Sequence, residues 1–109
     1  MTKIDVFSSI QGPMKLPIHT VSELGMAIRA VRKEQGLRQD DTAGSAGVGH
    51  VFLRDVERGK ETVQLGLVLK VLDELGIRLS IDIPSDAMSR FKELREKGPT
   101  PAGRGKTSP

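Results

Sequence analysis

The sequence contains no cysteine, tryptophan or tyrosine, and aromatic residues make up only 3% of its 109 positions. The absence of cysteine excludes disulfide bonds and thiol chemistry. Because aromatic side chains are so few, a hydrophobic core must consist mainly of valine, leucine, isoleucine and alanine. The length is that of one small domain, near the lower limit at which a single core is comfortably stable.

Long apolar runs and a strong charge of one sign are also missing. No stretch approaches the roughly 18–20 apolar residues that span a bilayer, and residues 1–10 do not resemble a signal peptide. The net charge of +3 is carried by the residues from Asp86 onward, with six basic and three acidic side chains, whereas residues 1–85 contain eleven of each sign. We therefore expect a soluble, cytoplasmic protein without a membrane partner, in which binding to nucleic acid would depend on a local patch.

Motifs of catalysis and metal binding are absent as well. The sequence has no Gly-x-Ser-x-Gly, no paired-histidine metal motif and no phosphate-binding loop that follows a strand. Its two histidines, His19 and His50, lack the spacing of metal ligands. We expect neither a metal nor another cofactor, and we do not expect an enzyme.

Residues 1–19 show no helical period and are expected to form an N-terminal arm. Within the arm, apolar and polar residues alternate at 3–7, as in a short strand. The first helix is predicted after this arm. Thr20 and Glu23 form a capping box, in which the hydroxyl accepts from the backbone of Glu23 and the carboxylate reaches back. The helix that follows is expected to end at Gly36. Its inward face is predicted to carry Val21, Leu24, Ile28 and Val31.

Three further helices are expected before residue 77. The first covers 39–46 and is followed by Gly47 in a turn that needs a positive φ, and the second covers 50–58 and ends at Gly59. Thr62 is predicted to cap the third, which ends at Gly76. The inward face of this third helix is predicted to carry Leu65, Val68, Leu69, Leu72 and Leu75.

The stretch from Ile77 to Ile83 alternates apolar and polar residues, which is typical of a half-buried strand. A lone strand leaves backbone groups unpaired, so it needs a partner. The same strand of a second copy would give a dimer joined at Ile77, Leu79 and Ile81; residues 3–7 of the same chain are the alternative. Residues 85–97 form a weak helix, and 98–109 read as a disordered tail. This divides the chain into an arm (1–19), a domain (20–84) and a basic tail (85–109).

The helix at 50–58 has two unlike sides. Phe52, Leu53 and Val56 lie on one side, which we expect to pack against the other helices. The opposite side carries His50, Val51, Arg54, Asp55 and Arg58. A short helix that enters from another short helix through a glycine turn is typical of a helix-turn-helix, whose second helix fits the major groove of DNA.

Residues 28–60, IRAVRKEQGLRQDDTAGSAGVGHVFLRDVERGK, resemble the Xre/lambda-repressor-like helix-turn-helix family. The matching residues are Leu37, Gln39, Ala43, Ala46, Gly47, Val48, Leu53, Glu57, Arg58 and Gly59. The continuation from Thr62 to Ile83 is similar to the HipB antitoxin branch, in which a short strand follows the DNA-binding core. The implied fold is an all-α, lambda-repressor-like bundle of four to five helices whose C-terminal β-strand pairs across a dimer. Arg38, Thr42, Gly44 and Gly49 depart from the family pattern.

The face and the resemblance together predict a set of DNA-binding residues. Arg54 would contact guanine or a phosphate, while His50 and Val51 would contact base edges; each also fits a solvated surface side chain. The resemblance assigns a phosphate contact to Gln39, and an ion pair between Arg32 and Glu57 that holds the helix in place. The full predicted DNA-binding set is Arg38, Gln39, Gly49, His50, Val51, Arg54, Asp55, Arg58 and Lys60.

The resemblance implies a repressor that binds operator DNA as a homodimer at the nucleoid. As an antitoxin of a type II toxin–antitoxin system, it would also neutralise a HipA-like serine/threonine kinase. The alternative is a protein-interaction module on a helix-turn-helix scaffold with weak affinity for DNA. A steep loss of DNA affinity with salt would distinguish the first from the second.

Overall fold

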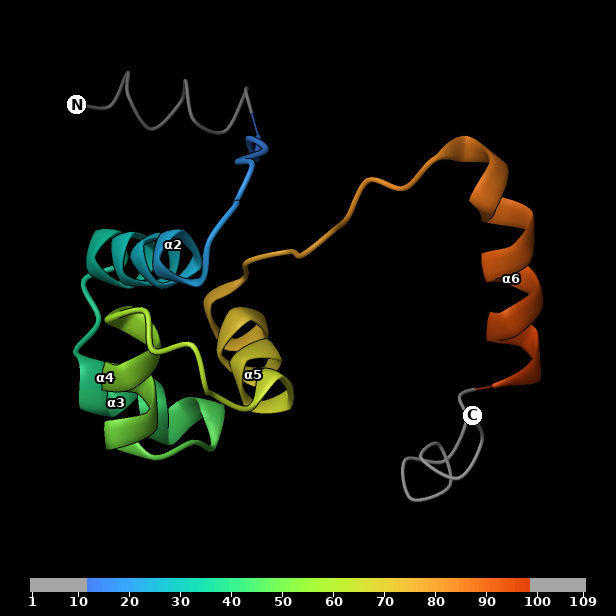
Figure 1. The fold of residues 1–109 in the computed structure, drawn as a ribbon. Helices are drawn as coiled ribbons and strands as arrows, with labels where there is room; N and C mark the ends of the chain where they lie inside the picture. The colour runs from blue at the N-terminus through green and yellow to red at the C-terminus, as the bar shows by residue number, and fades with distance from the viewer. Residues whose placement is uncertain (1–11, 99–109) are drawn as a thin grey trace. The chain divides into compact units, whose positions relative to one another are not determined.

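The computed structural model describes residues 12–98, which are helical with no β-strand among them. The helices are α2 (Val21–Glu34), α3 (Gln39–Ala46), α4 (His50–Glu57), α5 (Leu65–Leu75), the 3-10 turn η1 (Ser85–Ala87) and α6 (Met88–Lys97). The strand predicted at 3–7, most of the arm and the tail at 99–109 lie outside the described residues. The chain divides between Arg78 and Leu79 into two units, and Figure 1 shows the order of the helices.

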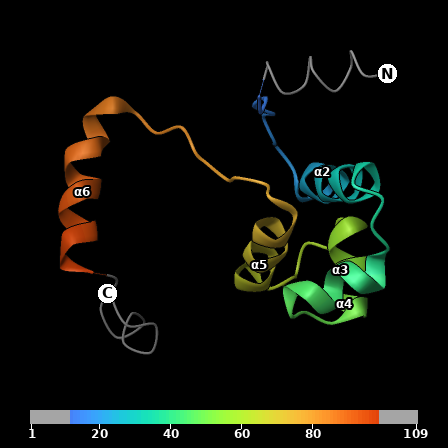
Figure 2. The same ribbon diagram turned by 180° about the vertical axis from the view of Figure 1, so that it is seen from behind.

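The first unit is built around one aliphatic core, as the composition predicts. Helices α3 and α4 lie side by side, α2 packs against α4 and α5, and α5 packs against α3, as both views of the ribbon show (Figures 1 and 2). The buried apolar side chains are Ile28, Ala43, Leu53, Val56, Val68, Val71, Leu72 and Leu75. This core fixes α4 with one side inward.

Helix α2 begins as the capping pattern predicts, with one change of partner. The Thr20 hydroxyl accepts from the backbone N–H of Glu23 at 3.0 Å. The Glu23 carboxylate accepts at 2.6 Å from the N–H of His19, one residue before the expected cap position. The N–H of Glu23, one of the donors that the first turn leaves unpaired, is thereby satisfied, and the bond to His19 ties the preceding residue to the helix.

Gly25 determines how closely α2 approaches α4. A Cβ at this position would lie 2.3 Å from the carbonyl oxygen of Val56 and 3.0 Å from that of Glu57. Distances of this kind are far below van der Waals contact, and both oxygens belong to the backbone, which cannot rotate away. The buried glycine therefore allows the last turn of α4 to lie directly on α2.

The connection from α3 to α4 follows the predicted turn. Gly47 has φ +76°, in the left-handed region that favours glycine. The N–H of Val48 then donates to the carbonyl of Ala43 at 3.0 Å, which closes the end of α3. Neither N-cap residue, Arg38 of α3 or Gly49 of α4, supplies a side-chain cap.

The predicted start and inward face of α5 need correction. Gln64, not Thr62, is the N-cap residue, and its carbonyl accepts from the N–H groups of Leu67 and Val68. The buried side chains follow the spacing i, i+3, i+4 and i+7 from Val68 to Leu75. Leu65 and Leu69 fall beside this stripe and are exposed. The leucines and valines of α5 cover more than one side of the helix, and only contacts with the neighbouring helices decide which of them are buried.

The strand predicted at 77–83 is not present in the single chain. Residues 77–84 have neither helix nor strand. A strand exists only through hydrogen bonds to a second strand, and the described residues contain none. Ile77 instead belongs to the end of α5: its N–H donates to the carbonyl of Leu72 at 2.9 Å, and its side chain packs against the core.

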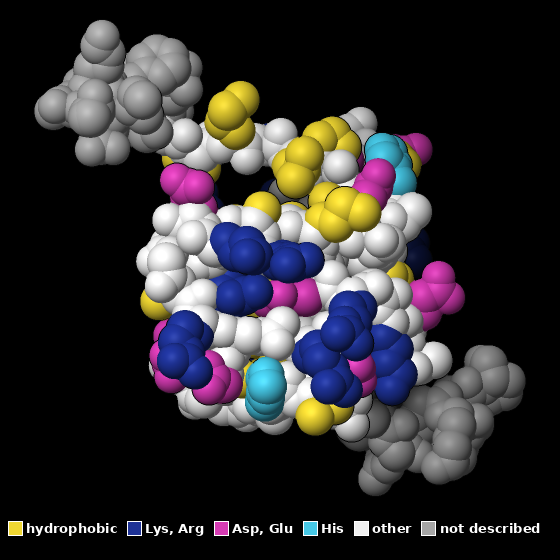
Figure 3. All heavy atoms as spheres, turned by 90° about the vertical axis from the view of Figure 1, so that its left-hand side faces the viewer, with side chains coloured by type: hydrophobic (Ala, Val, Ile, Leu, Met, Phe, Trp, Pro, Cys, Tyr) yellow, Lys and Arg dark blue, Asp and Glu magenta, His cyan; other side chains and the backbone are white. Residues whose placement is uncertain are grey.

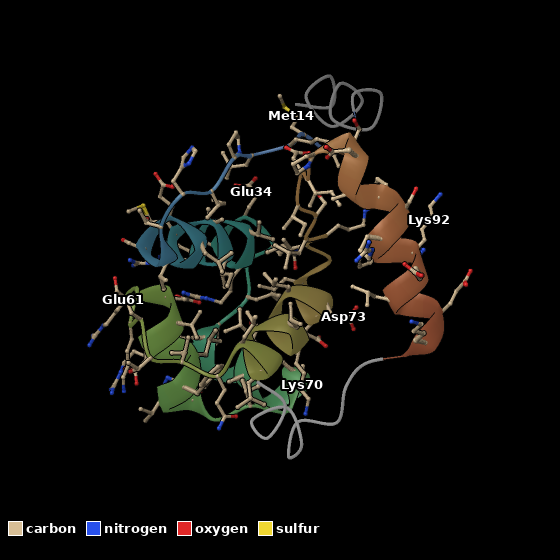
Figure 4. The ribbon with its side chains drawn as sticks, turned by 45° about the vertical axis from the view of Figure 1, so that its right-hand side comes forward. Met14, Glu34, Glu61, Lys70, Asp73 and Lys92 are labelled. Carbon is tan, nitrogen blue, oxygen red and sulfur yellow. The ribbon has the colours of Figure 1, made fainter. Side chains whose placement is uncertain are left out.

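The second unit, described from Leu79 to Gly98, contains η1 and α6 and has no buried residue. The predicted weak helix is therefore present, but its apolar stripe of Met88, Phe91 and Leu94 is exposed. Polar neighbours surround this stripe: the Arg95 guanidinium lies 5.0 Å from the centre of the Phe91 ring, and Figure 4 shows Lys92 projecting from α6. No helix of the described chain is long and apolar enough to cross a membrane.

Candidate nucleic-acid interface

Helix α4 has one buried side and one accessible side. Leu53, Val56 and Glu57 are buried, whereas His50, Val51 and Arg58 are exposed and Arg54 and Asp55 are half-buried. The division follows the helical period, because residues three and four apart share a side. Five of the residues predicted to contact DNA share this accessible side, whereas Arg38 and Gln39 lie at the start of α3 and Gly49 and Lys60 lie just outside α4.

A buried ion pair joins α2 to the end of α4, at the positions where the resemblance places one. Arg32 donates to Glu57 from Nε at 2.7 Å and from Nη2 at 2.9 Å. The two side chains are only 9% and 3% exposed, so the charges are shielded from water. A third bond, from Nη1 to the carbonyl of Leu37 at 2.8 Å, also fixes the loop before α3. The hydrogen bond with Glu57 raises the pKa of Arg32, which therefore stays charged despite its burial.

Gln39 extends this ion pair to the first residue of α4. Its Nε2 donates to Oε1 of Glu57 at 3.0 Å, and its Oε1 lies 3.2 Å from Nε2 of His50. Because the amide nitrogen faces the carboxylate, the amide oxygen is the acceptor and His50 is the donor. The relay from Arg32 through Glu57 and Gln39 to His50 connects three helices. The second N–H of Gln39 Nε2 has no acceptor among residues 12–98, so it is available for the predicted phosphate contact.

The single cation at the start of α3, Arg38, is paired with two aspartates, Asp40 and Asp41. Arg38 donates to both carboxylate oxygens of Asp40 at 3.3 Å, and its Nε lies 3.9 Å from Asp41. The hydrogen bond from Arg38 lowers the pKa of Asp40 below its ordinary value. These groups are exposed to solvent, so the ion pairs are weak. A phosphate contact by Arg38 would have to compete with the two aspartates.

Asp55 lies between two of the predicted cations. Its carboxylate is 3.6 Å from Nζ of Lys60 and 3.9 Å from Nε of Arg54. Arg58 forms no salt bridge within the described part of the chain. Gly49 precedes α4 without filling any space: a Cβ there would meet nothing within 4 Å. The backbone at the start of α4 is therefore accessible.

Two basic residues beside this face were not predicted from the sequence. Arg29 and Lys33 of α2 help to line a hollow of about 330 Å³ between α2 and α4. Figure 3 shows lysine and arginine side chains gathered on this side of the molecule around acidic ones. Their spacing of four, one helical turn, was the signal available in the sequence. The hollow is lined by Arg29, Arg32, Lys33, Gln39, Arg54, Glu57 and Arg58.

Metal ligands are not gathered anywhere in residues 12–98, where no group of three His, Cys, Asp or Glu side chains is arranged to hold an ion.

Comparison with known proteins agrees with this geometry. A family profile described as "Helix-turn-helix" matches residues 28–81. The HTH-type transcriptional regulator y4mF of Sinorhizobium fredii, itself uncharacterised, is 51% identical over 69 residues, which cover 63% of this chain and 91% of the relative.

Solved structures share the fold. The HipB–O4 20mer complex and the HipA–HipB–O2–O3 complex each match with a TM-score of 0.59 and 20% identity, over 63% of this chain and 97% of theirs. The clp gene regulator ClgR from C. glutamicum matches with a TM-score of 0.50 and 27% identity, over 57% of this chain and 80% of its own. The helical arrangement, the accessible side of α4 and the 51% identical relative lead to one conclusion: this chain belongs to the Xre-like helix-turn-helix family of transcriptional regulators.

Proposed function

We propose that this protein is a repressor that binds operator DNA as a homodimer and also acts as the antitoxin of a HipA-like serine/threonine kinase. One observation carries the DNA-binding part. The accessible side of α4 remains uncovered by the rest of its unit, while the buried ion pair of Arg32 with Glu57 holds the helix from behind. A short helix held this way can enter the major groove.

The residues on and around α4 would contact different parts of the DNA. Val51, which is 55% exposed, suits contact with a thymine methyl group, and His50 stands beside it at the start of the helix. Arg54 suits a guanine edge, with Asp55 setting its direction. Gln39, Arg58 and Lys60 would contact phosphates, which position the protein without reading sequence.

A dimer would account for the alternating segment that has no partner in the single chain. Leu79 and Ile81 are 57% and 79% exposed, and a second copy of the same segment would pair their backbone groups. Two copies of α4 about 34 Å apart would then match a palindromic site. Ile77 does not contribute a free side chain, because it packs on its own core.

A similar fold in a complex with HipA and the composition of the second unit support the antitoxin part. HipB, whose fold is similar, was solved in complexes with an O4 20mer and, together with HipA, with O2–O3. The second unit of this chain has a stripe of apolar side chains and no core of its own, which is typical of a segment that packs on a partner. A kinase would be that partner.

Selection of bound duplexes from a random DNA library, followed by salt titration, tests the repressor proposal. We expect a palindromic site and an affinity that falls steeply with salt. His50→Ala and Val51→Ala should each lower the preference for that site over random DNA by roughly ten-fold. Lys70→Gln is the matched control, because Lys70 is exposed on α5, outside the interface (Figure 4).

Light scattering tests the dimer. Leu79→Asp combined with Ile81→Asp should convert a dimer into a folded monomer, since neither side chain belongs to the core. A wild-type chain that is monomeric at micromolar concentration would refute this part alone.

The kinase proposal is tested by expressing the native operon, purifying this protein and assaying what co-purifies with it for serine/threonine phosphorylation. Inhibition of that activity by added pure chain is the expected result. If neither DNA selection nor salt dependence appears and a partner still binds, the chain is a protein-interaction module on this scaffold instead.

A further inference from the structure

We propose that the hollow between α2 and α4 binds a phosphate of the DNA backbone, with Arg29 and Lys33 of α2 as phosphate contacts. This inference rests on the proposed binding of DNA, and it assigns residues that lie outside the recognition helix. Two basic pairs, each one helical turn apart, line the hollow from two helices: Arg29 with Lys33, and Arg54 with Arg58.

The charge balance of the hollow favours an anion. Its lining contains five basic side chains and one acidic one, which gives 5 − 1 = +4. Both oxygens of the single carboxylate, on Glu57, already accept hydrogen bonds from Arg32 and Gln39. The carboxylate therefore neutralises Arg32, and four positive charges remain without a counterion in the lining.

Three of these four cations form no salt bridge within the described residues, and the fourth, Arg54, has only a long contact with Asp55. Within residues 12–98, no salt bridge involves Arg29, Lys33 or Arg58. The Nε atom of Arg54 lies 3.9 Å from the carboxylate of Asp55. The Nε atom of Arg54 is buried yet has no hydrogen-bond partner among these residues.

The position of the hollow favours the DNA backbone as the source of the phosphate. Arg54 and Arg58 belong to the accessible side of α4, so the hollow borders the surface proposed to enter the major groove. The walls of that groove are rows of phosphates, which arginine and lysine contact more often than any other DNA group. The volume of about 330 Å³ accommodates a phosphate with its water.

The test measures how the affinity for a 25-bp duplex of mixed sequence depends on salt, using the full chain. A residue that contacts a phosphate contributes about one to the slope of log affinity against log salt. Lys33→Gln and Arg29→Gln should each lower that slope by about one per protomer, equally for any DNA sequence. Lys33→Arg should retain the slope, and Lys70→Gln, which removes the same charge from α5, should leave it unchanged.

The outcomes separate the sources of the anion. Wild-type slopes in both α2 variants, with DNA binding intact, would overturn the inference and leave the repressor proposal standing. If tripolyphosphate or a polyglutamate peptide binds the wild type and loses affinity in the variants while the DNA slope stays constant, the hollow serves a free phosphate or an acidic protein, and the inference is wrong. Absence of DNA binding by the wild type would instead refute the proposed function itself. Circular dichroism would verify that every variant is folded.

Discussion

Helix α4 is held in different ways by its two neighbours, α2 and α3. Toward α2 there is a glycine in backbone contact and a buried ion pair with two hydrogen bonds. Toward α3 the connection has no side-chain cap at Gly49, an open position at Gly44 and a buried hydroxyl of Thr42 without a partner among the described residues. Helix α2 therefore holds α4 through a buried ion pair and a close backbone contact, whereas α3 holds it through packing and the hydrogen bonds of Gln39 to Glu57 and His50.

The largest loss of stability is expected when one partner of the ion pair between α2 and α4 is removed. Arg32→Met or Glu57→Leu alone leaves one charge buried without its partner, and we expect a loss of about 3–5 kcal/mol in the free energy of unfolding. The variant with both changes should recover much of the loss, since an apolar pair can replace a buried ion pair. Urea denaturation of the three variants measures this, and a loss below about 1 kcal/mol in the single variants would contradict it.

Gly25→Ala tests the close contact of α2 with α4. The added methyl group would overlap two backbone oxygens, so the helices must separate. Overpacking of this kind costs about 1–3 kcal/mol, which outweighs the intrinsic helix preference of alanine. Thermal unfolding should show a lower midpoint, and an unchanged or higher midpoint would show that the contact is not tight.

Thr42→Val tests the α3 side of the comparison and should increase the free energy of unfolding. The change replaces an unpaired buried hydroxyl by a methyl group of similar shape, and we expect a gain of about 1 kcal/mol. Chemical denaturation is again the measurement. Destabilisation would mean that the hydroxyl has a partner, such as a bound water.

The smallest effect is expected at Gly44. A Cβ at this helical position meets nothing within 4 Å, so Gly44→Ala should gain about 0.5–1 kcal/mol from helix preference alone. It is the counterpart of Gly25→Ala, with the same chemical change and the opposite sign. If both substitutions changed the free energy of unfolding in the same direction, the proposed difference between the α2 and α3 contacts of α4 would be wrong.

Local signals in the sequence were sufficient for most of the first unit. The Thr20 cap, the left-handed Gly47 and the two sides of α4 all depend on residues within a few positions of each other, and all are confirmed. The tight contact at Gly25 was not predicted, because it depends on residues that meet only after folding.

The pairing of residues 29 and 33 with α4 escaped prediction for the same reason. The strand at 77–83 failed differently: alternation describes which side of a segment is apolar, but a strand also needs a neighbour to pair with. Thr62 shows a third limit: threonine is a preferred N-cap residue and glutamine is not, yet the helix begins after Gln64, whose side chain forms no cap.

The bond between Gln39 and His50 has a consequence for which bases the protein can prefer. With Nε2 of the imidazole donating to the amide oxygen, a neutral ring directs a lone pair, on Nδ1, away from the relay. A lone pair at that place complements the exocyclic amino groups of adenine and cytosine and is repelled by O6 and N7 of guanine. In the proposed complex, the bond to Gln39 would therefore leave an acceptor at position 50 for DNA as long as the ring is neutral.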